Sequence, residues 1–262
     1  MIMCFYMQGT SQCYSSLKSL SNKFRGMLCH CGSDNKYNRL DEKLEKKMIE
    51  VKRSSSGQSN FKSVDSIILR FPQFKAGLKN IKGVFEHHDE DSNGIIDREE
   101  LKKCLEKLQL SLKEQEIDEL FDFCDIDGSE GIQFNEFIVL LCLIYLLVIP
   151  SSSPDMIEKV GSPELKATFD TIVDAFLFLD KNGDGKLNKK DMLKSLNESY
   201  PREKSPAHVT KNRFKEMDWD KNGKVSFREF LFSLIRWVGI DTDEEITESN
   251  EIGTNEEITD RE

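Results

Sequence analysis

The sequence predicts an all-α protein built from four helix-loop-helix units in two pairs. Four acidic segments of twelve residues recur along it, and apolar residues at helical spacing flank each of them. We call these segments loop 1 (89–100), loop 2 (125–136), loop 3 (180–191) and loop 4 (218–229). Their starts are 36, 55 and 38 residues apart, so the longer middle interval separates loops 1 and 2 from loops 3 and 4. Because one such unit cannot bury its own apolar face, pairing supplies the missing partner.

Start and stop signals place the helices around the loops. Pro72 predicts the start of the helix before loop 1, and Ser111–Glu114 has the capping-box pattern before loop 2. Ser162–Pro163 opens the helix before loop 3, and Gly239 ends the helix after loop 4. The helix after Pro72 carries four apolar residues on one face, namely Phe74, Leu78, Ile81 and Phe85.

Composition divides the chain further. Residues 1–63 hold 11 Lys and Arg against 5 Asp and Glu, whereas residues 241–262 hold 10 acidic residues against one Arg. Serine and proline cluster between the two pairs. The predicted division is a basic, largely disordered head at 1–60, the first pair at 61–149, a linker at 150–161, the second pair at 162–240 and an acidic disordered tail at 241–262. Within the head, Leu40–Val51 has the pattern of a short charged helix.

The bulk properties exclude several classes of protein. The net charge of −10 argues against general binding of nucleic acid. Seven irregularly spaced cysteines and the lack of an apolar leader region predict a reducing, intracellular location, cytoplasmic or nuclear. The head and the tail are too short for a catalytic domain, so we expect no enzymatic activity.

An apolar run at Phe137–Ile149 raises the question of a membrane. Its 13 residues fall short of the ~20 that a span needs, and we expect a helix leaving loop 2. Two interpretations of this helix stay open, a surface for a target protein or core packing under cover of the linker. Cys29 and Cys31 lie near basic residues, which leaves reversible acylation open as a tether.

The loops have the pattern of EF-hand calcium loops. Oxygen-bearing side chains stand at positions 1, 3, 5 and 9, a backbone carbonyl at position 7 and a carboxylate at position 12. Calcium takes six to eight oxygens, so one loop can supply most of a coordination shell. The apolar position 8 should pair across a short two-stranded bridge, Ile96 with Ile132 and Leu187 with Val225.

Loops 1 and 4 meet every requirement of the pattern, including Gly at position 6. The candidate ligands of loop 1 are Asp89, Asp91, Asn93, the Ile95 carbonyl, Asp97 and Glu100. Those of loop 4 are Asp218, Asp220, Asn222, the Lys224 carbonyl, Ser226 and Glu229. We expect both loops to bind Ca²⁺.

Loop 3 departs from the pattern at its last position. Its candidate ligands are Asp180, Asn182, Asp184, the Lys186 carbonyl, Asn188 and Asp191. Because Asp191 is one methylene shorter than Glu, it should give a cation one oxygen rather than two. This weakens the binding of Ca²⁺ and favours the binding of Mg²⁺.

Loop 2 departs further, with Glu130 at position 6, where a left-handed residue other than Gly costs about 1–2 kcal/mol. Its candidate ligands are Asp125, Asp127, Ser129, the Gly131 carbonyl, Gln133 and Glu136. Shifting the register to place Gly131 at position 6 would put Ile126 at position 1, which destroys the site. We therefore keep Asp125 first and expect loop 2 to be the weakest site.

With these loops the chain resembles the EF-hand calcium sensors, and within them the plant calmodulin-like proteins, over roughly residues 61–240. The phrases at Glu90–Gly94, Phe134–Phe137 and Met217–Gly223 carry the resemblance. It implies a sensor without catalysis that exposes apolar surface on binding Ca²⁺ and engages an amphipathic helix of a target protein. The incomplete loops 2 and 3 keep an alternative, a Ca²⁺/Mg²⁺ buffer or structural module that opens little.

Overall fold

The computed structural model describes residues 34–55, 59–108, 110, 112–147, 163–199 and 207–240. The predicted linker at 150–161, the acidic tail at 241–262 and Cys29 and Cys31 lie outside the described residues.

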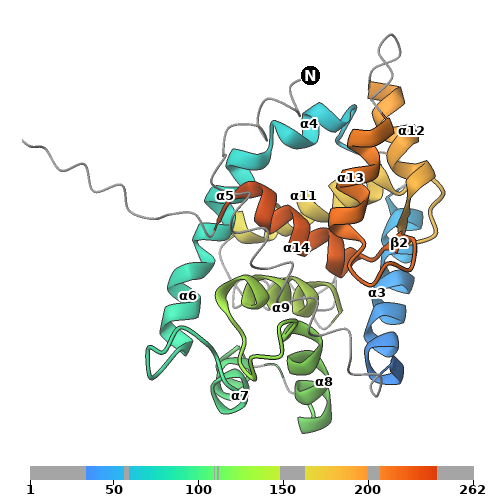
Figure 1. Ribbon diagram of the computed structural model, residues 1–262. Helices are drawn as coiled ribbons and strands as arrows, with labels where there is room; N and C mark the ends of the chain where they lie inside the picture. Colours follow the sequence, from blue (N-terminus) through green and yellow to red (C-terminus); the bar gives the residue numbers. More distant parts are fainter. Residues whose placement is uncertain are drawn as a thin grey trace, which may run out of the picture.

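The described chain is mainly helical, with two very short strands, which confirms the predicted fold class (Figure 1). The helices are α3 (Asp34–Ser54), α4 (Val64–Ile68), α5 (Phe71–Lys79), α6 (Ile81–His88), α7 (Arg98–Lys107), α8 (Glu114–Cys124), α9 (Phe134–Leu147), α11 (Pro163–Leu179), α12 (Lys189–Ser199), α13 (Ala207–Met217) and α14 (Phe227–Val238). The strands are β1 (Leu187–Asn188) and β2 (Lys224–Val225). Loops 1 to 4 therefore join α6 to α7, α8 to α9, α11 to α12 and α13 to α14.

The loops pair as the sequence predicted. β1 and β2 are antiparallel, with Leu187 opposite Val225. Ile96 and Ile132 form the equivalent bridge of the first pair, with amide-to-carbonyl distances of 2.9 and 2.8 Å. Both bridging pairs are completely buried, which ties each loop to its neighbour.

Two of the predicted helix boundaries need correction. The helix after Pro72 is divided into α5 and α6 at Asn80, although its apolar face stays buried across the joint. Helix α8 begins at Glu114 with Lys113 at its N-cap, two residues later than the predicted N-cap Ser111, which itself lies outside the described residues. The Glu116 carboxylate accepts a hydrogen bond from the Lys113 amide at 3.0 Å and fixes the later start. The predicted start at Pro163 and the stop at Gly239, which has a φ of +70°, are confirmed.

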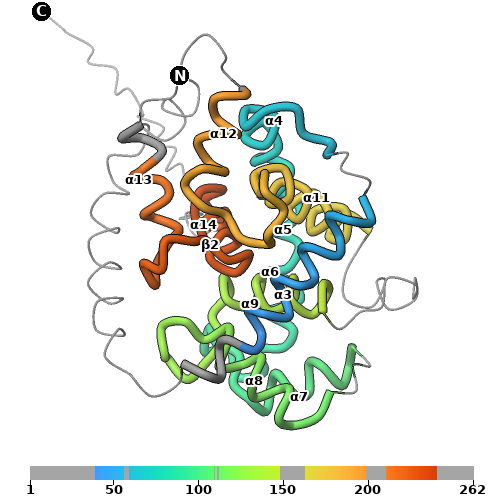
Figure 2. Tube along the Cα trace, turned by 90° about the vertical axis from the view of Figure 1, so that its right-hand side faces the viewer, coloured from blue at the N-terminus to red at the C-terminus, as the bar shows by residue number. Residues whose placement is uncertain are grey.

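Helix α9 lies at the centre of the molecule, where the two pairs meet (Figures 1 and 2). It packs against α8 and α6 of its own pair, against α14 of the second pair and against α3. Every residue from Phe137 to Ile144 is fully buried. Of the two interpretations of this apolar run, core packing is therefore the one that the structure supports, and the cover includes α3 and α14.

Helix α3 corrects the prediction of a largely disordered head that extends to residue 60. It packs against α8, α9 and α14, alongside the pairs in Figure 2. Leu40, Leu44 and Met48 are buried in the common core because their spacing of four places them on one face of the helix. The predicted charged helix at Leu40–Val51 is thus longer, Asp34–Ser54, and part of the fold.

The segment α4–α5 covers apolar surface of the second pair. Helix α5 packs against α11 and α14, and α4 packs against α12. The segment is amphipathic, with buried Val64, Ile67, Ile68, Phe71, Phe74 and Leu78. At the crossing of α5 and α11, a Cβ added to Gly77 would lie 2.1 Å from Thr168 Oγ1, so glycine allows the two helices to touch.

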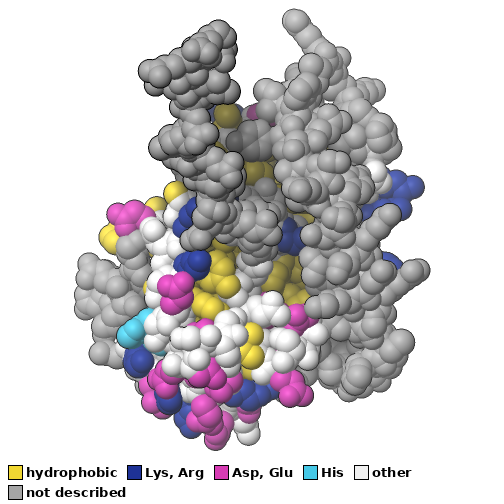
Figure 3. Space-filling view, turned by 60° about the vertical axis from the view of Figure 1, so that its left-hand side comes forward, with side chains coloured by type: hydrophobic (Ala, Val, Ile, Leu, Met, Phe, Trp, Pro, Cys, Tyr) yellow, Lys and Arg dark blue, Asp and Glu magenta, His cyan; other side chains and the backbone are white. Residues whose placement is uncertain are grey.

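Acidic side chains gather at the end of the molecule where α6 and α7 lie, and apolar side chains are visible above them (Figure 3). In the described part of the chain, each helix is too short or too polar to cross a bilayer.

Candidate metal centres in the four loops

The four loops share one backbone conformation. Position 4 has a positive φ in each loop, at Ser92, Gly128, Gly183 and Lys221. Position 6 does so too, at Gly94, Glu130, Gly185 and Gly223, with φ between +61° and +83°. Loop 2 therefore adopts the turn with Asp125 first, as predicted, and holds Glu130 in the left-handed region.

The aspartate at position 1 is fixed by amides inside its own loop. The Asp89 carboxylate accepts hydrogen bonds from Asn93 and Gly94 at 3.0 and 2.9 Å. Asp125 and Asp180 accept equivalent bonds, the latter from the Gly185 amide at 3.1 Å. Asp218 accepts one from the Gly223 amide at 3.2 Å. The sharp turn thus aims the first carboxylate into the loop before any cation arrives.

The glutamate at position 12 joins the two ends of loops 1, 2 and 4. In loop 1, Glu100 accepts hydrogen bonds from the amides of Glu90 at 2.8 Å and Asp97 at 2.9 Å. Glu136 and Glu229 make the same two contacts with positions 2 and 9 of their loops. These glutamates also stand in the first turn of α7, α9 and α14, so each connects a loop to the helix that leaves it.

Loop 3 lacks half of this connection. Asp191 accepts a hydrogen bond from the Asn188 amide at 3.0 Å, but within the described residues it receives none from Lys181 at position 2. The shorter side chain reaches only one end of the loop, and the number of oxygens that Asp191 would give a cation stays a prediction.

Three carboxylate clusters are compatible with a divalent cation. In each cluster, one oxygen from each of three residues lies within 4.8 Å of the others: Asp89, Asp91 and Glu100; Asp125, Asp127 and Glu136; Asp218, Asp220 and Glu229. Loop 3 forms no such cluster in the described part of the chain. The hard oxygen donors of loops 1, 2 and 4 therefore fit Ca²⁺ or Mg²⁺.

Burial makes several of these carboxylates costly to ionise. Loss of solvent raises the pKa of Glu136 and Glu229 to about 7, against the effect of the amides that donate to them. Burial also raises the pKa of Asp125, Asp180 and Asp218. A cation held among these oxygens would supply the compensating charge.

Comparison with known proteins agrees with this geometry. Two models of an EF-hand domain pair match the sequence, over residues 92–142 and 169–248. Probable calcium-binding protein CML22 of Arabidopsis thaliana is 57% identical over 220 residues, which cover 82% of this chain and 96% of that protein. Probable calcium-binding protein CML21 of Arabidopsis thaliana is 50% identical over 205 residues, 78% of this chain and 88% of that protein.

The chain belongs to the EF-hand calmodulin-like proteins. This confirms the resemblance that the loops predicted. Calcium-dependent protein kinase 16 of Oryza sativa subsp. japonica is 28% identical over 154 residues, which cover 59% of this chain and only 24% of the kinase. The calmodulin-like relatives, in contrast, are matched over almost their whole length.

Loop 2 of this EF-hand protein differs from its partner loop in how the candidate ligands contact each other. The Ser129 hydroxyl donates to the Gly131 carbonyl at 3.0 Å, and the Gln133 amide donates to Asp127 at 2.8 Å. A cation would have to displace both hydrogen bonds. Loop 1 has a comparable contact, from the Asn93 amide to Asp91 at 2.8 Å, so the strained Glu130 remains the reason to rank loop 2 below loop 1.

Two residues that bear on the loops were missed by the sequence analysis. Arg228, at position 11 of loop 4, reaches the carbonyl of Phe123 just before loop 2. Lys52 of α3 reaches the carbonyl of Asp180 at the start of loop 3. Neither belongs to the ligand pattern, and a basic residue in a sequence gives no sign of such a distant partner.

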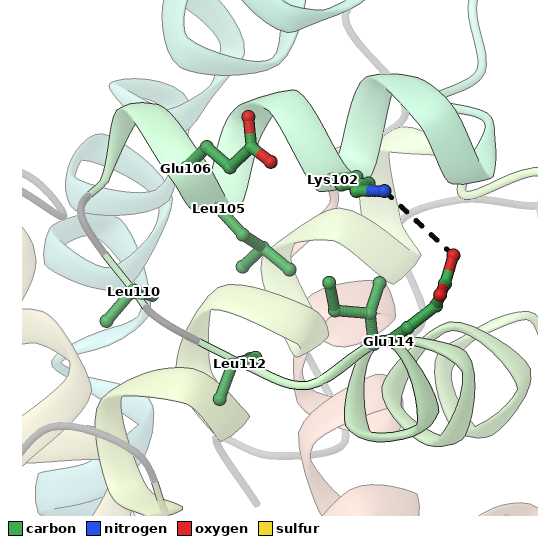
Figure 4. Close-up of a pocket in the computed structure, with 7 residues that line it drawn as sticks. Lys102, Leu105, Glu106, Leu110, Leu112 and Glu114 are labelled. Carbon is green, nitrogen blue, oxygen red and sulfur yellow. Dashed lines mark ion pairs between the residues drawn. The ribbon is translucent and has the colours of Figure 1, made fainter.

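A cavity of about 330 Å³ lies between α7 and α8 of the EF-hand protein, away from the loop oxygens (Figure 4). Its wall combines Leu105, Leu110, Leu112 and Ile117 with the ion pair between Lys102 and Glu114 at 3.9 Å. It offers no cluster of oxygen ligands, so the candidate metal centres remain the loops.

Proposed function

We propose that this protein is a calcium sensor whose loops bind Ca²⁺ and transmit the binding to a shared apolar core. The observation that carries the proposal is the contact between α9 and α14. Glu136 stands in the first turn of α9, and Glu229 in the first turn of α14. A cation that draws either carboxylate inward acts on a helix that packs against the exit helix of the other pair.

The loops contribute unequally. Loops 1 and 4 bind Ca²⁺ most tightly, since their oxygen sets are complete and their turns have glycine at position 6. Loop 2 binds more weakly, because Glu130 occupies the left-handed position 6 at a cost in backbone strain. Loop 3, with Asn182 and the short Asp191, favours Mg²⁺ over Ca²⁺ relative to the other loops.

The partner that this arrangement suits is an amphipathic helix of a target protein. The segment α4–α5 already packs in that manner against α11, α12 and α14 of the second pair. Movement of α14 would loosen this segment and offer its surface to another helix with apolar residues at the same spacing. The protein then acts as an adaptor and needs no catalytic group of its own.

A titration of the full chain tests the sensor role. Trp219 is well placed as a probe, because its amide donates to Glu229 at 3.0 Å and its ring packs on Phe232 with centroids 5.3 Å apart. Replacement of Trp237 by Phe leaves Trp219 as the only tryptophan. We expect micromolar Ca²⁺ to change the Trp219 emission and, over the same range, to increase the fluorescence of a hydrophobic dye.

Glu229→Gln should shift the Trp219 response to at least tenfold higher Ca²⁺ by removing a charged ligand. The control Glu216→Gln changes a neighbouring carboxylate that pairs with Arg213 and lies outside the loop, and it should behave as the unchanged protein. Ca²⁺ binding without any rise in dye fluorescence would instead support the buffer alternative, which loops 2 and 3 favour.

A further inference from the structure

Helix α3 lies directly on loop 3. The Lys52 ammonium donates hydrogen bonds to the carbonyls of Leu177, at 3.4 Å, and of Asp180. It stands 3.9 Å from Asp180 Oδ2, and the Asp180 side chain is completely buried. A fixed positive charge therefore lies beside the first ligand position of this loop.

The backbone of α3 also touches the turn of loop 3. A Cβ added to Gly185 would lie 2.7 Å from the Glu45 carbonyl oxygen. The next residue, Lys186, pairs with the Glu45 carboxylate at 2.9 Å. Glycine is thus required at position 185 by the close approach of α3 as well as by its φ of +80°.

The other loops with glycine at position 6 have no such cover. A Cβ added to Gly94 of loop 1 or to Gly223 of loop 4 would meet nothing within 4 Å. Loop 3 is also the loop without a cluster of three converging carboxylates among the described residues. Cover by α3 and a reduced set of acidic ligands thus coincide in one loop.

We propose that Lys52 is a resident cation of loop 3, and that α3 and a divalent cation compete for this loop. The ammonium of Lys52 would repel an ion bound through Asp180, so the docked helix lowers the affinity of loop 3 for the ion. By linkage, the ion must weaken the docking of α3 by the same factor. The inference rests on cation binding by the loops, but not on the engagement of a target.

The size of the effect follows from the distance between the charges. A unit charge within several ångströms of a divalent ion at a protein surface changes the binding constant on the order of tenfold. Release of α3 would expose the surface that covers Leu40, Leu44 and Met48. Loop 3 thereby becomes the site at which cation concentration controls the N-terminal helix.

The test follows each loop separately in the full chain. In protein labelled with ¹⁵N-glycine, the amides of Gly94, Gly185 and Gly223 report loops 1, 3 and 4 during a Ca²⁺ titration. For Lys52→Met we expect the Gly185 midpoint to fall about tenfold, with Gly94 and Gly223 unchanged within twofold. Lys52→Arg retains the charge and should keep the midpoint of the unchanged protein.

The matched control is Lys46→Met on the same helix, where Lys46 is exposed and pairs with Glu42 at 3.9 Å. It removes the same charge away from loop 3 and should leave Gly185 unaffected. A Gly185 midpoint that shifts equally in the two variants would overturn the proposal, because the effect would then be one of net charge.

Hydrogen exchange supplies a second readout. In the unchanged protein, filling loop 3 should speed exchange of the α3 amides at least tenfold, and exchange that stays constant or slows while Gly185 titrates contradicts competition. If Gly94 and Gly223 also fail to respond to Ca²⁺, cation binding itself is refuted and the proposed function falls with the inference.

Discussion

The guanidinium of Arg228 lies over the ring of Phe123, with its central carbon 4.0 Å from the ring centroid, and donates to the Phe123 carbonyl at 2.9 Å. Arg228 belongs to loop 4, whereas Phe123 lies in the last turn of α8, the helix that enters loop 2. The same guanidinium stands 3.8 Å from Asp41 of α3. One side chain thus connects both pairs to the N-terminal helix.

Replacement of Arg228 by Met should lower the free energy of unfolding by about 2–4 kcal/mol. The loss includes the charged hydrogen bond and the counter-ion of Asp41, whose pKa burial already raises. Arg213→Met is the control, because Arg213 pairs only with the exposed Glu216 in the described structure and should change stability by about 0.5 kcal/mol or less. Urea unfolding measures the stability of both variants, and equal losses of stability would refute the role of Arg228 in connecting the two pairs to α3.

Two glycine substitutions, one at the crossing of α5 and α11 and one in α6 away from it, should have opposite effects on stability. Gly77→Ala places a methyl group against Thr168 and should destabilise the protein by about 1–3 kcal/mol. Gly83→Ala, in α6, meets nothing within 4 Å and should stabilise it by about 0.5–1 kcal/mol. Thermal unfolding of the two variants checks the signs, and a stabilising Gly77→Ala would show that the helices separate at little cost.

Glu130 should be replaceable by Gly with a gain in stability. Its φ of +61° is strained for a side chain, and release of about 1–2 kcal/mol outweighs the added freedom of the unfolded chain. Glu106→Gly makes the same change inside α7, where it should cost about 1 kcal/mol. Denaturation midpoints that move in the same direction for both variants would contradict the strain at Glu130.

Asp191→Glu should make the ion preference of loop 3 more like that of the other loops. The longer side chain can reach the Lys181 amide as well as that of Asn188, so Ca²⁺ affinity should rise about tenfold relative to Mg²⁺. The Gly185 amide in competing titrations measures the change. The reverse swap in loop 1, Glu100→Asp, should weaken Ca²⁺ at Gly94 to a similar extent, and an unaltered ion preference in both variants would show that the length of this side chain is unimportant.

The loops and their bridges could be predicted because their signals are local. A twelve-residue pattern contains its own turn, and Ile96 and Ile132 are identified by position alone. The burial of α9 was one of two interpretations, since its apolar run fits both a core helix and a surface for a target protein. Composition could not decide between them, because the cover comes from α3 and α14.

The placement of α3 could not be read in the same way. Its buried face was visible in the spacing of Leu40, Leu44 and Met48, but the many charges of this segment suggested a solvated head. What docks it are contacts between distant residues, such as Lys52 with Asp180, which are 128 positions apart. A single sequence contains no record of such pairs.

The burial of Leu40, Leu44 and Met48 against the exit helices has a consequence for the design of protein fragments. The motif boundaries invite a recombinant piece that starts at residue 61, just upstream of the first pair. Such a fragment would lack α3 and would expose apolar surface on α8, α9 and α14, and this surface would favour self-association. Its precipitation, or its stickiness toward unrelated proteins, would then be an artefact of the cut and no measure of the intact molecule.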